Sequence, residues 1–491
     1  MRNILRRLSA YPALIFLLAA AVSVLVYLAF SAAGGVVGFP LDDAWIHQTY
    51  ARNLGLRGEF AFIPGQPSAG STSLLWTALL AIGYVLRLEP HVWAYTLGVL
   101  LLGLNAWLVY RLVRRWWPAS SAAALAAGLL VTLEWHLVWS AGSGMETLLY
   151  AAGALAIFVL DWPAQAGLAG LVAGLAVLTR PDGLSLLPFL AVRAWLAGPP
   201  DWRAAVRASL GFGLLFGPYL LFNVSLSGTP WPNTFYAKQA EYAVLREQPL
   251  LSRLAEIGSL PFIGVLALLM PAILIGGWQA LRQRQWEKLL ALGWVVGVIG
   301  TYALRLPVTY QHGRYLMPVI PLLVALGAGG LAQIIRPRSG QLLARVFSRA
   351  WLAAAVLLAL VFWLRGALAY GTDVQIIETE MVATARWVAG NTPPDALIAA
   401  HDIGALGYFG GRRVLDMAGL VSPEVIPFIR DEAQLSAWLD RSGANDLETF
   451  PSWYPALTAA RQVQRVFVTG GTVSPAAGGE NMAVYIWQPR Q

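Results

Sequence analysis

The sequence predicts a polytopic α-helical membrane protein that ends in a small α/β domain. The chain has 491 residues, of which 57% are hydrophobic and only 12% are charged, and its mean hydropathy is +0.59. Soluble globular proteins carry roughly 25% charged residues, so this composition excludes a soluble enzyme. The charges are unevenly spread, because residues 1–370 hold 26 basic and 13 acidic side chains and residues 371–491 hold 8 and 13. We therefore expect a basic membrane domain over 1–370 and a more polar, acidic domain over 371–491.

The first predicted span is the apolar run from Tyr11 to Ala33, which is long enough to cross roughly 30 Å of hydrocarbon. Arg2, Arg6 and Arg7 precede it and place the N-terminus in the cytoplasm by the positive-inside rule. A cleaved signal peptide is the alternative, but many later apolar runs argue against it. Those runs lie at 72–88, 92–111, 119–139, 145–160, 163–179, 183–197, 208–226, 258–281, 289–304, 315–335 and 349–369.

Basic clusters between these runs predict the orientation of the membrane domain. They fall within 111–115, 203–207, 282–288 and 336–345, and the positive-inside rule makes all four cytoplasmic. Strict alternation through every run would place them outside, so we expect one run, 72–88, to be re-entrant or interfacial. The prediction is then roughly 11 to 13 transmembrane helices in the plasma membrane, with the C-terminal domain extracytoplasmic.

The C-terminal domain is predicted to mix a helix with short strands. Apolar residues recur at helical spacing over 373–390, and Gly390-Asn391 followed by Pro393-Pro394 ends the pattern. Strand-like runs follow, separated by Gly and Pro turns, at 396–400, 414–417, 463–469 and 483–487. The chain has no Cys, which excludes a disulfide or a thiolate metal site, and it carries no nucleotide-binding glycine loop.

The first outer loop, residues 34–71, carries the sharpest chemical signal. Asp42 and Asp43 follow directly after the first span, and a short helix that begins near Asp43 places Asp43, His47 and Tyr50 on one face. Two aspartates at a helix start also cap backbone N–H groups and suit the helix dipole, which is the purely structural interpretation. Paired carboxylates at a membrane surface can instead act as a general base or as metal ligands. We expect Asp42 and Asp43 to be catalytic.

Two further outer segments place charges at the edge of apolar runs. Glu146 enters an apolar run, and an unpaired buried Glu is costly, so it should face a cavity or a cationic partner. Arg180 lies on the outer side against the positive-inside bias, next to Asp182. Either an ion pair within the turn or a phosphate ligand would explain Arg180.

Polar and cationic residues in two later outer loops complete the candidate substrate-binding set. The loop at 230–238 sets one of the two lysines of the chain among aromatic residues, where a snorkelling interfacial Lys is the structural alternative. The loop before the run at 315–335 places a His and an Arg at headgroup depth, as suits a phosphate. The residues taken from these two loops are Asn233, Tyr236, Lys238, His312, Arg314 and Tyr315.

Together these motifs resemble the GT-C superfamily of integral-membrane glycosyltransferases, which use polyprenyl-linked sugars. The motifs are Leu41-Asp42-Asp43, 50–54, 144–147, 180–183, 232–238 and 312–315. Among its branches the sequence is most similar to bacterial proteins akin to the terminal arabinofuranosyltransferase, and more distantly to protein O-mannosyltransferases and lipid A aminoarabinose transferases. It lacks the His-Pro-Pro element of the O-mannosyltransferases, so a protein acceptor of that type is not expected. The segment 401–416 is similar to extracytoplasmic domains of such transferases, and a strand-turn-helix core explains it equally well.

The resemblance implies an inverting transfer from a polyprenyl-phosphate sugar to a cell-envelope glycan or lipid acceptor on the outer face of the membrane. Asp42 or Asp43 would deprotonate the acceptor hydroxyl, and cations would stabilise the departing phosphate. The cations available for this are Arg180, Lys238, His312 and Arg314. No spacing in the sequence fixes a metal site, so no cofactor is expected, although a divalent cation could bridge a carboxylate and the phosphate. A transporter or flippase of a lipid-linked sugar is the alternative function.

Overall fold

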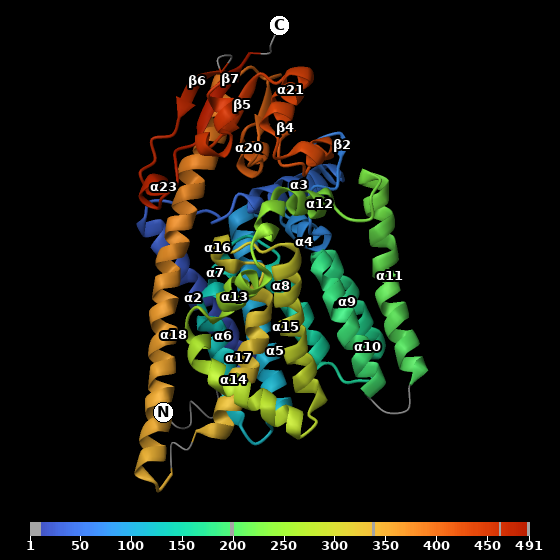
Figure 1. The fold of residues 1–491 in the computed structure, drawn as a ribbon, viewed down its shortest axis with the longest axis vertical. Helices are drawn as coiled ribbons and strands as arrows, with labels where there is room; N and C mark the ends of the chain where they lie inside the picture. The colour runs from blue at the N-terminus through green and yellow to red at the C-terminus, as the bar shows by residue number, and fades with distance from the viewer. Residues whose placement is uncertain (1–10, 197–200, 336–338, 461–462, 489–491) are drawn as a thin grey trace.

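The computed structural model describes residues 11–196, 201–335, 339–460 and 463–488. The basic residues Arg2, Arg6, Arg7, Arg336 and Arg338, which entered the orientation argument, lie outside the described residues. Helices form a bundle along the long axis of the molecule, and a small sheet with its own helices sits on one end (Figure 1). This is the predicted fold class, a polytopic helical membrane protein with a C-terminal α/β domain.

The described bundle contains seven helical segments long and apolar enough to cross a membrane. They are α2 (Pro12–Ala33), α5 (Pro90–Trp116), α11 (Trp202–Ser227), α14 (Val265–Arg282), α15 (Trp286–Arg305), Tyr310–Ile334, which includes α16 (Tyr310–Gly313) and α17 (Ile320–Ile334), and Leu342–Asn391, which begins with α18 (Leu342–Ile377). The pair α6 (Ser121–Leu133) and α7 (Trp135–Gly142) passes the same test together and is bent by 51°. The shorter apolar helices are α4 (Leu74–Val85), α8 (Thr147–Val159) and α9 (Ala166–Thr179).

Helix α4 corresponds to the run that we expected to be re-entrant or interfacial. It has 12 residues, and at 1.5 Å per residue it is roughly 18 Å long, too short to cross the hydrocarbon core. The predicted run at 183–197 is a 3-10 turn, η1 (Pro181–Leu186), followed by the 10-residue helix α10 (Leu187–Leu196). These short helices account for the difference between the number of apolar runs and the number of full-length spans.

The helix ends that carry the basic clusters at 111–115, 203–207 and 282–288 lie at the end of the bundle away from the sheet (Figure 1). Arg115 at the end of α5 pairs with Glu287 at the start of α15 at 2.7 Å and with Asp161 at 2.8 Å. Arg193 of α10 reaches the same Glu287 at 3.2 Å. The C-terminal domain and these basic clusters thus occupy opposite ends of the bundle, and which end faces the cytoplasm stays a prediction.

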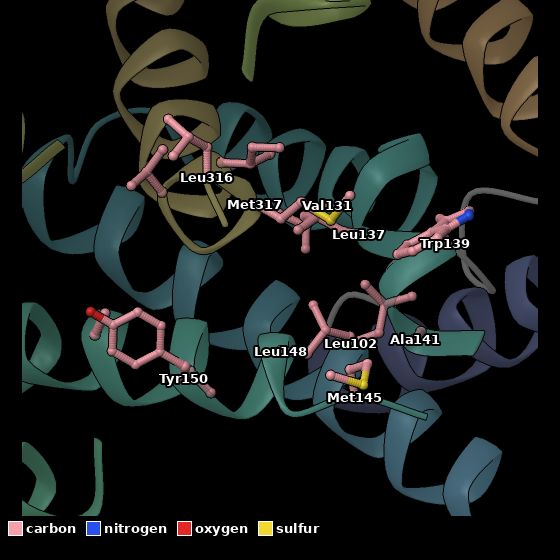
Figure 2. Close-up of a cluster of buried hydrophobic side chains, with 14 of the residues drawn as sticks. Leu102, Val131, Leu137, Trp139, Ala141, Met145, Leu148, Tyr150, Leu316 and Met317 are labelled. Atoms are coloured by element: carbon pink, nitrogen blue, oxygen red, sulfur yellow. The ribbon is translucent and has the colours of Figure 1, made fainter. Parts of the chain in front are cut away.

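The centre of the bundle is a tightly packed apolar core. Figure 2 shows part of it, where Leu102 of α5, Val131 of α6 and Leu148 of α8 pack with residues of α7 and with the segment that precedes α17. Gly98 of α5 allows α7 to approach closely, because a Cβ there would lie 1.9 Å from the carbonyl oxygen of Ala141. This dry core fixes the helices whose outer ends carry the polar residues.

The C-terminal domain is a five-stranded mixed sheet in the order β4-β3-β5-β7-β6. Strands β3 (Leu397–Ala400), β4 (Arg413–Asp416), β6 (Val463–Val468) and β7 (Ala483–Trp487) follow the four predicted runs. The central strand β5 (Asp446–Thr449) was not predicted, because its sequence Asp-Leu-Glu-Thr shows no apolar pattern although all four residues are buried. Strand β3 runs parallel to β4 and β5, and β7 runs antiparallel to β5 and β6.

The helix predicted over 373–390 is the upper part of the last span and not a separate element. Helix α18 continues without a break through the π-helical turn η5 (Glu378–Val382) into α19 (Ala383–Asn391). Glu380 in this turn is fully buried and accepts hydrogen bonds from the Met482 backbone N–H at 2.9 Å, the Asn481 amide at 3.2 Å and the Thr469 hydroxyl. A continuous helix therefore carries the sheet.

Candidate functional site

A cavity of about 600 Å³ lies between the outer ends of the helices and the C-terminal domain. Its walls come from α3 (Asp43–Arg57), the start of α8, η1, α12 (Asn233–Glu241), the end of α15 and the segment before α17. Leu420 brings the C-terminal domain into the lining. The predicted site residues that line it are Asp43, His47, Glu146, Arg180, Asp182, Lys238, Arg314 and Tyr315.

Asp43 is the carboxylate of the diacid that faces the cavity. The Arg314 guanidinium donates to Asp43 Oδ2, and Lys238 Nζ lies 3.4 Å from the same oxygen. Lys238 also donates to the Tyr315 hydroxyl at 3.1 Å. Burial alone would raise the pKa of Asp43, but Lys238 and Arg314 hold it well below its ordinary value. Asp43 is therefore an ionised carboxylate that is paired with two cations, Lys238 and Arg314.

The backbone before Arg314 has an uncommon conformation. Gln311, His312 and Gly313 have φ values of 53°, 56° and 65°, a left-handed stretch that non-glycine residues rarely adopt. His312 Nε2 lies 2.7 Å from Asp373 Oδ2 of α18, and the imidazole ring packs edge-on against Trp135 and Trp139. His312 does not line the cavity, and its contacts hold the turn that presents Arg314.

A second charged cluster lies next to the first, because the guanidinium groups of Arg180 and Arg314 lie 5.2 and 5.1 Å from the centre of the same Tyr315 ring. Arg180 contacts Glu146 at 3.1 Å and Asp182 at 3.0 Å, and donates to the Tyr302 hydroxyl at 3.0 Å. His47 Nε2 lies 3.5 Å from the other Glu146 oxygen. Arg180 forms the expected ion pair with Asp182, and Glu146 has both a cationic partner and a place in the cavity lining, while a phosphate on Arg180 stays a prediction.

Asp42 is turned away from the cavity toward the C-terminal domain. Its two carboxylate oxygens accept hydrogen bonds from the backbone N–H groups of Gly404 and Ala405, each at 2.7 Å, at the start of α20 (Gly404–Phe409). Burial and the nearby Asp402 raise the pKa of the Asp42 carboxyl, while the two backbone N–H groups act in the opposite direction. The two aspartates of the diacid thus have different surroundings.

Three further predicted residues, Tyr50, Asn233 and Tyr236, do not line the cavity. The Tyr50 hydroxyl lies 2.7 Å from the Ser68 hydroxyl and accepts from the Gly70 backbone N–H at 2.9 Å. Asn233 donates to the Leu420 carbonyl at 3.0 Å. Tyr50 and Asn233 therefore shape the loops around the cavity.

Sequence reasoning missed several polar residues of the lining, above all Tyr302. Its hydroxyl donates to Asp182 and accepts from Arg180, which ties α15 to η1. The available signal was that Thr301 and Tyr302 form a polar pair at the outer end of an otherwise apolar run. The other missed polar residues are Ser71, Thr72, Ser185, Thr234, Gln239 and Arg305.

Two parts of the lining have hydrogen-bonding capacity left over. Arg314 is 5% exposed, and its Nε and Nη1 atoms have no hydrogen-bond partner among the described residues. Glu146 is 2% exposed, and its Oε2 atom likewise lacks one within the described part of the chain. Buried polar groups are normally paired, so these atoms suit a polar ligand that brings both anionic and hydroxyl groups. In the same described ranges, no group of three or more His, Asp or Glu has an arrangement that could hold a metal ion.

Comparisons with known proteins were made for the sequence and for the fold. A family model described as a domain of unknown function (DUF8728) matches residues 367–485, which is the C-terminal domain. No curated protein sequence matches. The fold is similar to ArnT from Cupriavidus metallidurans, in the apo state and bound to undecaprenyl phosphate, with a TM-score of 0.63 and 16% identity over 95% of this chain and 97% of that one.

A second solved structure shares the same architecture. The arabinofuranosyltransferase AftD from Mycobacteria matches with a TM-score of 0.50 and 17% identity over 97% of this chain, which corresponds to 40% of the AftD chain. The described chain therefore shares its fold with ArnT and with the matched part of AftD, which agrees with the fold that its motifs led us to expect. At these identities the likeness concerns the fold alone.

Proposed function

We propose that this protein is an inverting glycosyltransferase that moves a sugar from a polyprenyl-phosphate donor to a glycan or lipid acceptor of the cell envelope. The transfer would take place on the outer face of the cytoplasmic membrane. The observation that carries the proposal is that Asp43, Arg314 and Lys238 meet in one cavity between the helix bundle and the C-terminal domain. A base and the cations needed by a leaving phosphate are thereby within one site.

Asp43 is the proposed general base. It removes the proton of an acceptor hydroxyl, whose oxygen forms a new bond to the anomeric carbon. The bond from that carbon to the phosphate oxygen breaks, the electron pair leaves with polyprenyl phosphate, and the configuration inverts. Asp42 is unsuited to this role because both of its oxygens are already bonded to the C-terminal domain.

Arg314 and Lys238 are proposed to bind the donor phosphate. In the described state they are engaged with Asp43, and this lowers the pKa of the carboxyl and its strength as a base. A phosphate that takes hydrogen bonds from these cations would weaken their hold on Asp43. Donor binding would then raise the basicity of Asp43 at the moment when the acceptor needs it.

The cluster formed by Arg180, Glu146 and Asp182 is proposed to bind the sugar. Over the residues that the structure describes, Glu146 Oε2 has no partner within hydrogen-bond geometry beyond its 3.5 Å contact with His47 Nε2, and Ser71, Thr72 and Ser185 add hydroxyl groups to the same lining. Such a mixture of carboxylate and hydroxyl groups recognises sugar hydroxyls through directional hydrogen bonds. The similar protein ArnT was solved with undecaprenyl phosphate, which supports a polyprenyl phosphate as the donor lipid.

The test is turnover by purified wild-type protein with a panel of polyprenyl-phosphate sugars, measured as release of free polyprenyl phosphate with and without cell-envelope acceptors. Asp43→Asn should lower the rate by roughly 10²–10⁴-fold, the usual contribution of a general base. Asp161→Asn is a matched control, because this aspartate lies on the basic end of the bundle. Wild-type turnover by Asp43→Asn would overturn the assignment of the base. Transport of a lipid-linked sugar without turnover of any donor would favour the alternative function.

A further inference from the structure

The C-terminal domain contacts both elements that carry the Asp43–Lys238 ion pair. Helix α20 of that domain lies against α3, which begins with Asp43, and Figure 1 shows α3 and α12 directly beneath the domain. On the other side, Asn233 at the start of α12 donates to the Leu420 carbonyl at 3.0 Å. The end of α12 is also held, because His401 Nε2 lies 3.2 Å from Glu241 Oε1.

Helix α20 is bound at both ends by side chains next to or within α3. Asp42 accepts from the Gly404 and Ala405 N–H groups at its start. Arg52 donates to the Tyr408 and Gly407 carbonyls at its end, at 2.9 and 3.3 Å, and its guanidinium lies 4.5 Å from the centre of the Tyr408 ring. Carboxyl oxygens that accept at the N-terminal end and a cation at the C-terminal end also match the direction of the helix dipole.

The fit between the two elements leaves no space for a side chain at Gly404. A Cβ there would lie 2.1 Å from the Asp42 carbonyl oxygen and 2.6 Å from Asp42 Oδ2. Asp42 and Asp43 are consecutive, so a displacement of Asp42 moves the backbone that carries Asp43. Gly404, which makes the contact with Asp42 possible, lies in the segment 401–416. A strand-turn-helix core was one of the two explanations that the sequence offered for this segment.

We infer that the C-terminal domain is an integral part of the active site, because α20 fixes the position of Asp43 through Asp42 and Arg52. Asp42 and Arg52 are therefore positioning residues. The inference rests on the proposed function, because it takes Asp43 as the base. Its consequence is that loosening α20 from α3 weakens the ion pair of Asp43 with Lys238 and Arg314 without removing any group from the cavity.

The experiment compares Asp42→Asn, Asp42→Ala and Arg52→Met in the full-length protein. Asn keeps one oxygen that can accept from α20, whereas Ala keeps none. A positioning role predicts that Asp42→Asn is at least 10-fold more active than Asp42→Ala, and that Arg52→Met loses roughly 10-fold or more in kcat. If Asp42 were the base, Asn and Ala would be equally inactive, and the inference would be overturned.

The pH profile of kcat/KM, which reports the pKa of the base in the free enzyme, supplies the readout that a merely structural role would not change. The charged or titratable groups that act on Asp43 are Lys238, Arg314, His47, Asp42, Asp402 and Tyr315. If Arg52→Met loosens the hold of the cations, the acidic limb of the profile should move to higher pH by at least half a unit. Partial unfolding would lower kcat/KM at every pH and leave that limb unmoved, which counts against the inference.

Gly404→Ala tests the same contact from the other side, and Gly390→Ala is its control, because a Cβ at Gly390 meets no atom within 4 Å. Gly404→Ala should lower kcat as much as Asp42→Ala, and the two changes together should lose little more than either alone. If Gly404→Ala fails to fold, the Asn, Ala and Met variants still decide. If Asp43→Asn loses turnover while the Asp42, Arg52 and Gly404 variants keep wild-type rates, the inference alone is overturned. If Asp43→Asn keeps wild-type turnover, the proposed function is overturned.

Discussion

Replacing Arg180 by methionine should strongly destabilise the protein, because it leaves buried carboxylates without their cation. Arg180 is 8% exposed and pairs with Glu146, itself 2% exposed, and with Asp182. Breaking a buried ion pair on one side costs about 3–5 kcal/mol. With an unfolding entropy near 2.1 cal/mol/K per residue, a chain of this length should lose about 3–5 °C in Tm.

The assay is thermal unfolding of the detergent-purified protein at pH 7, followed through tryptophan fluorescence, and the matched change is Glu146→Gln. Glu146→Gln removes the buried charge that Arg180→Met leaves unpaired, so the double variant should be more stable than the sum of the single losses predicts. A coupling energy of about 1–3 kcal/mol is expected for residues in direct contact. Additive losses, or an Arg180→Met protein as stable as the wild type, would refute the reasoning.

Three other predictions concern substitutions of single residues. Burial, reinforced by Asp42 and Asp402, raises the pKa of Glu448 well above its ordinary value, so the stability that this carboxyl contributes in its protonated form is lost as pH rises above that value. Glu448→Gln should therefore be near neutral at pH 4 and should raise Tm at pH 8, and an equal effect at both pH values would contradict this. Gln311→Gly relieves a left-handed φ of 53° and removes an unpaired buried oxygen, so it should stabilise the protein by about 1 kcal/mol in the same thermal assay. Gly98→Ala should lower Tm by about 1–3 °C, because its Cβ would lie 1.9 Å from the Ala141 carbonyl oxygen, and an unchanged Tm would show that α5 and α7 can separate.

Much of the membrane domain could be predicted from the sequence, because hydrophobic runs and basic clusters are physical requirements of a bilayer. The positions of Asp43, Glu146, Arg180, Lys238 and Arg314 could also be assigned to one outer surface. Their meeting in one cavity depends on contacts between α3, η1, α12 and the segment before α17, and such long-range contacts leave no local pattern in the sequence.

The features that escaped prediction have tertiary causes. Strand β5 is polar in sequence yet buried, because it pairs with β3 and β7 in the middle of the sheet. His312 has the composition of a phosphate ligand, but its partner is Asp373, which lies 61 residues later on α18. Asp42 and Asp43 are indistinguishable in sequence, and only the distant start of α20 separates their surroundings.

The unbroken helical path from Leu342 to Asn391 sets how far the sheet stands from the membrane-spanning part of the last helix. Fifty residues at 1.5 Å per residue make a rod of about 75 Å, and about 30 Å of it suffices to cross the hydrocarbon. The segment 392–396 joins this rod directly to the first strand of the sheet, so a tilt of the helix in the membrane would tilt the sheet with it.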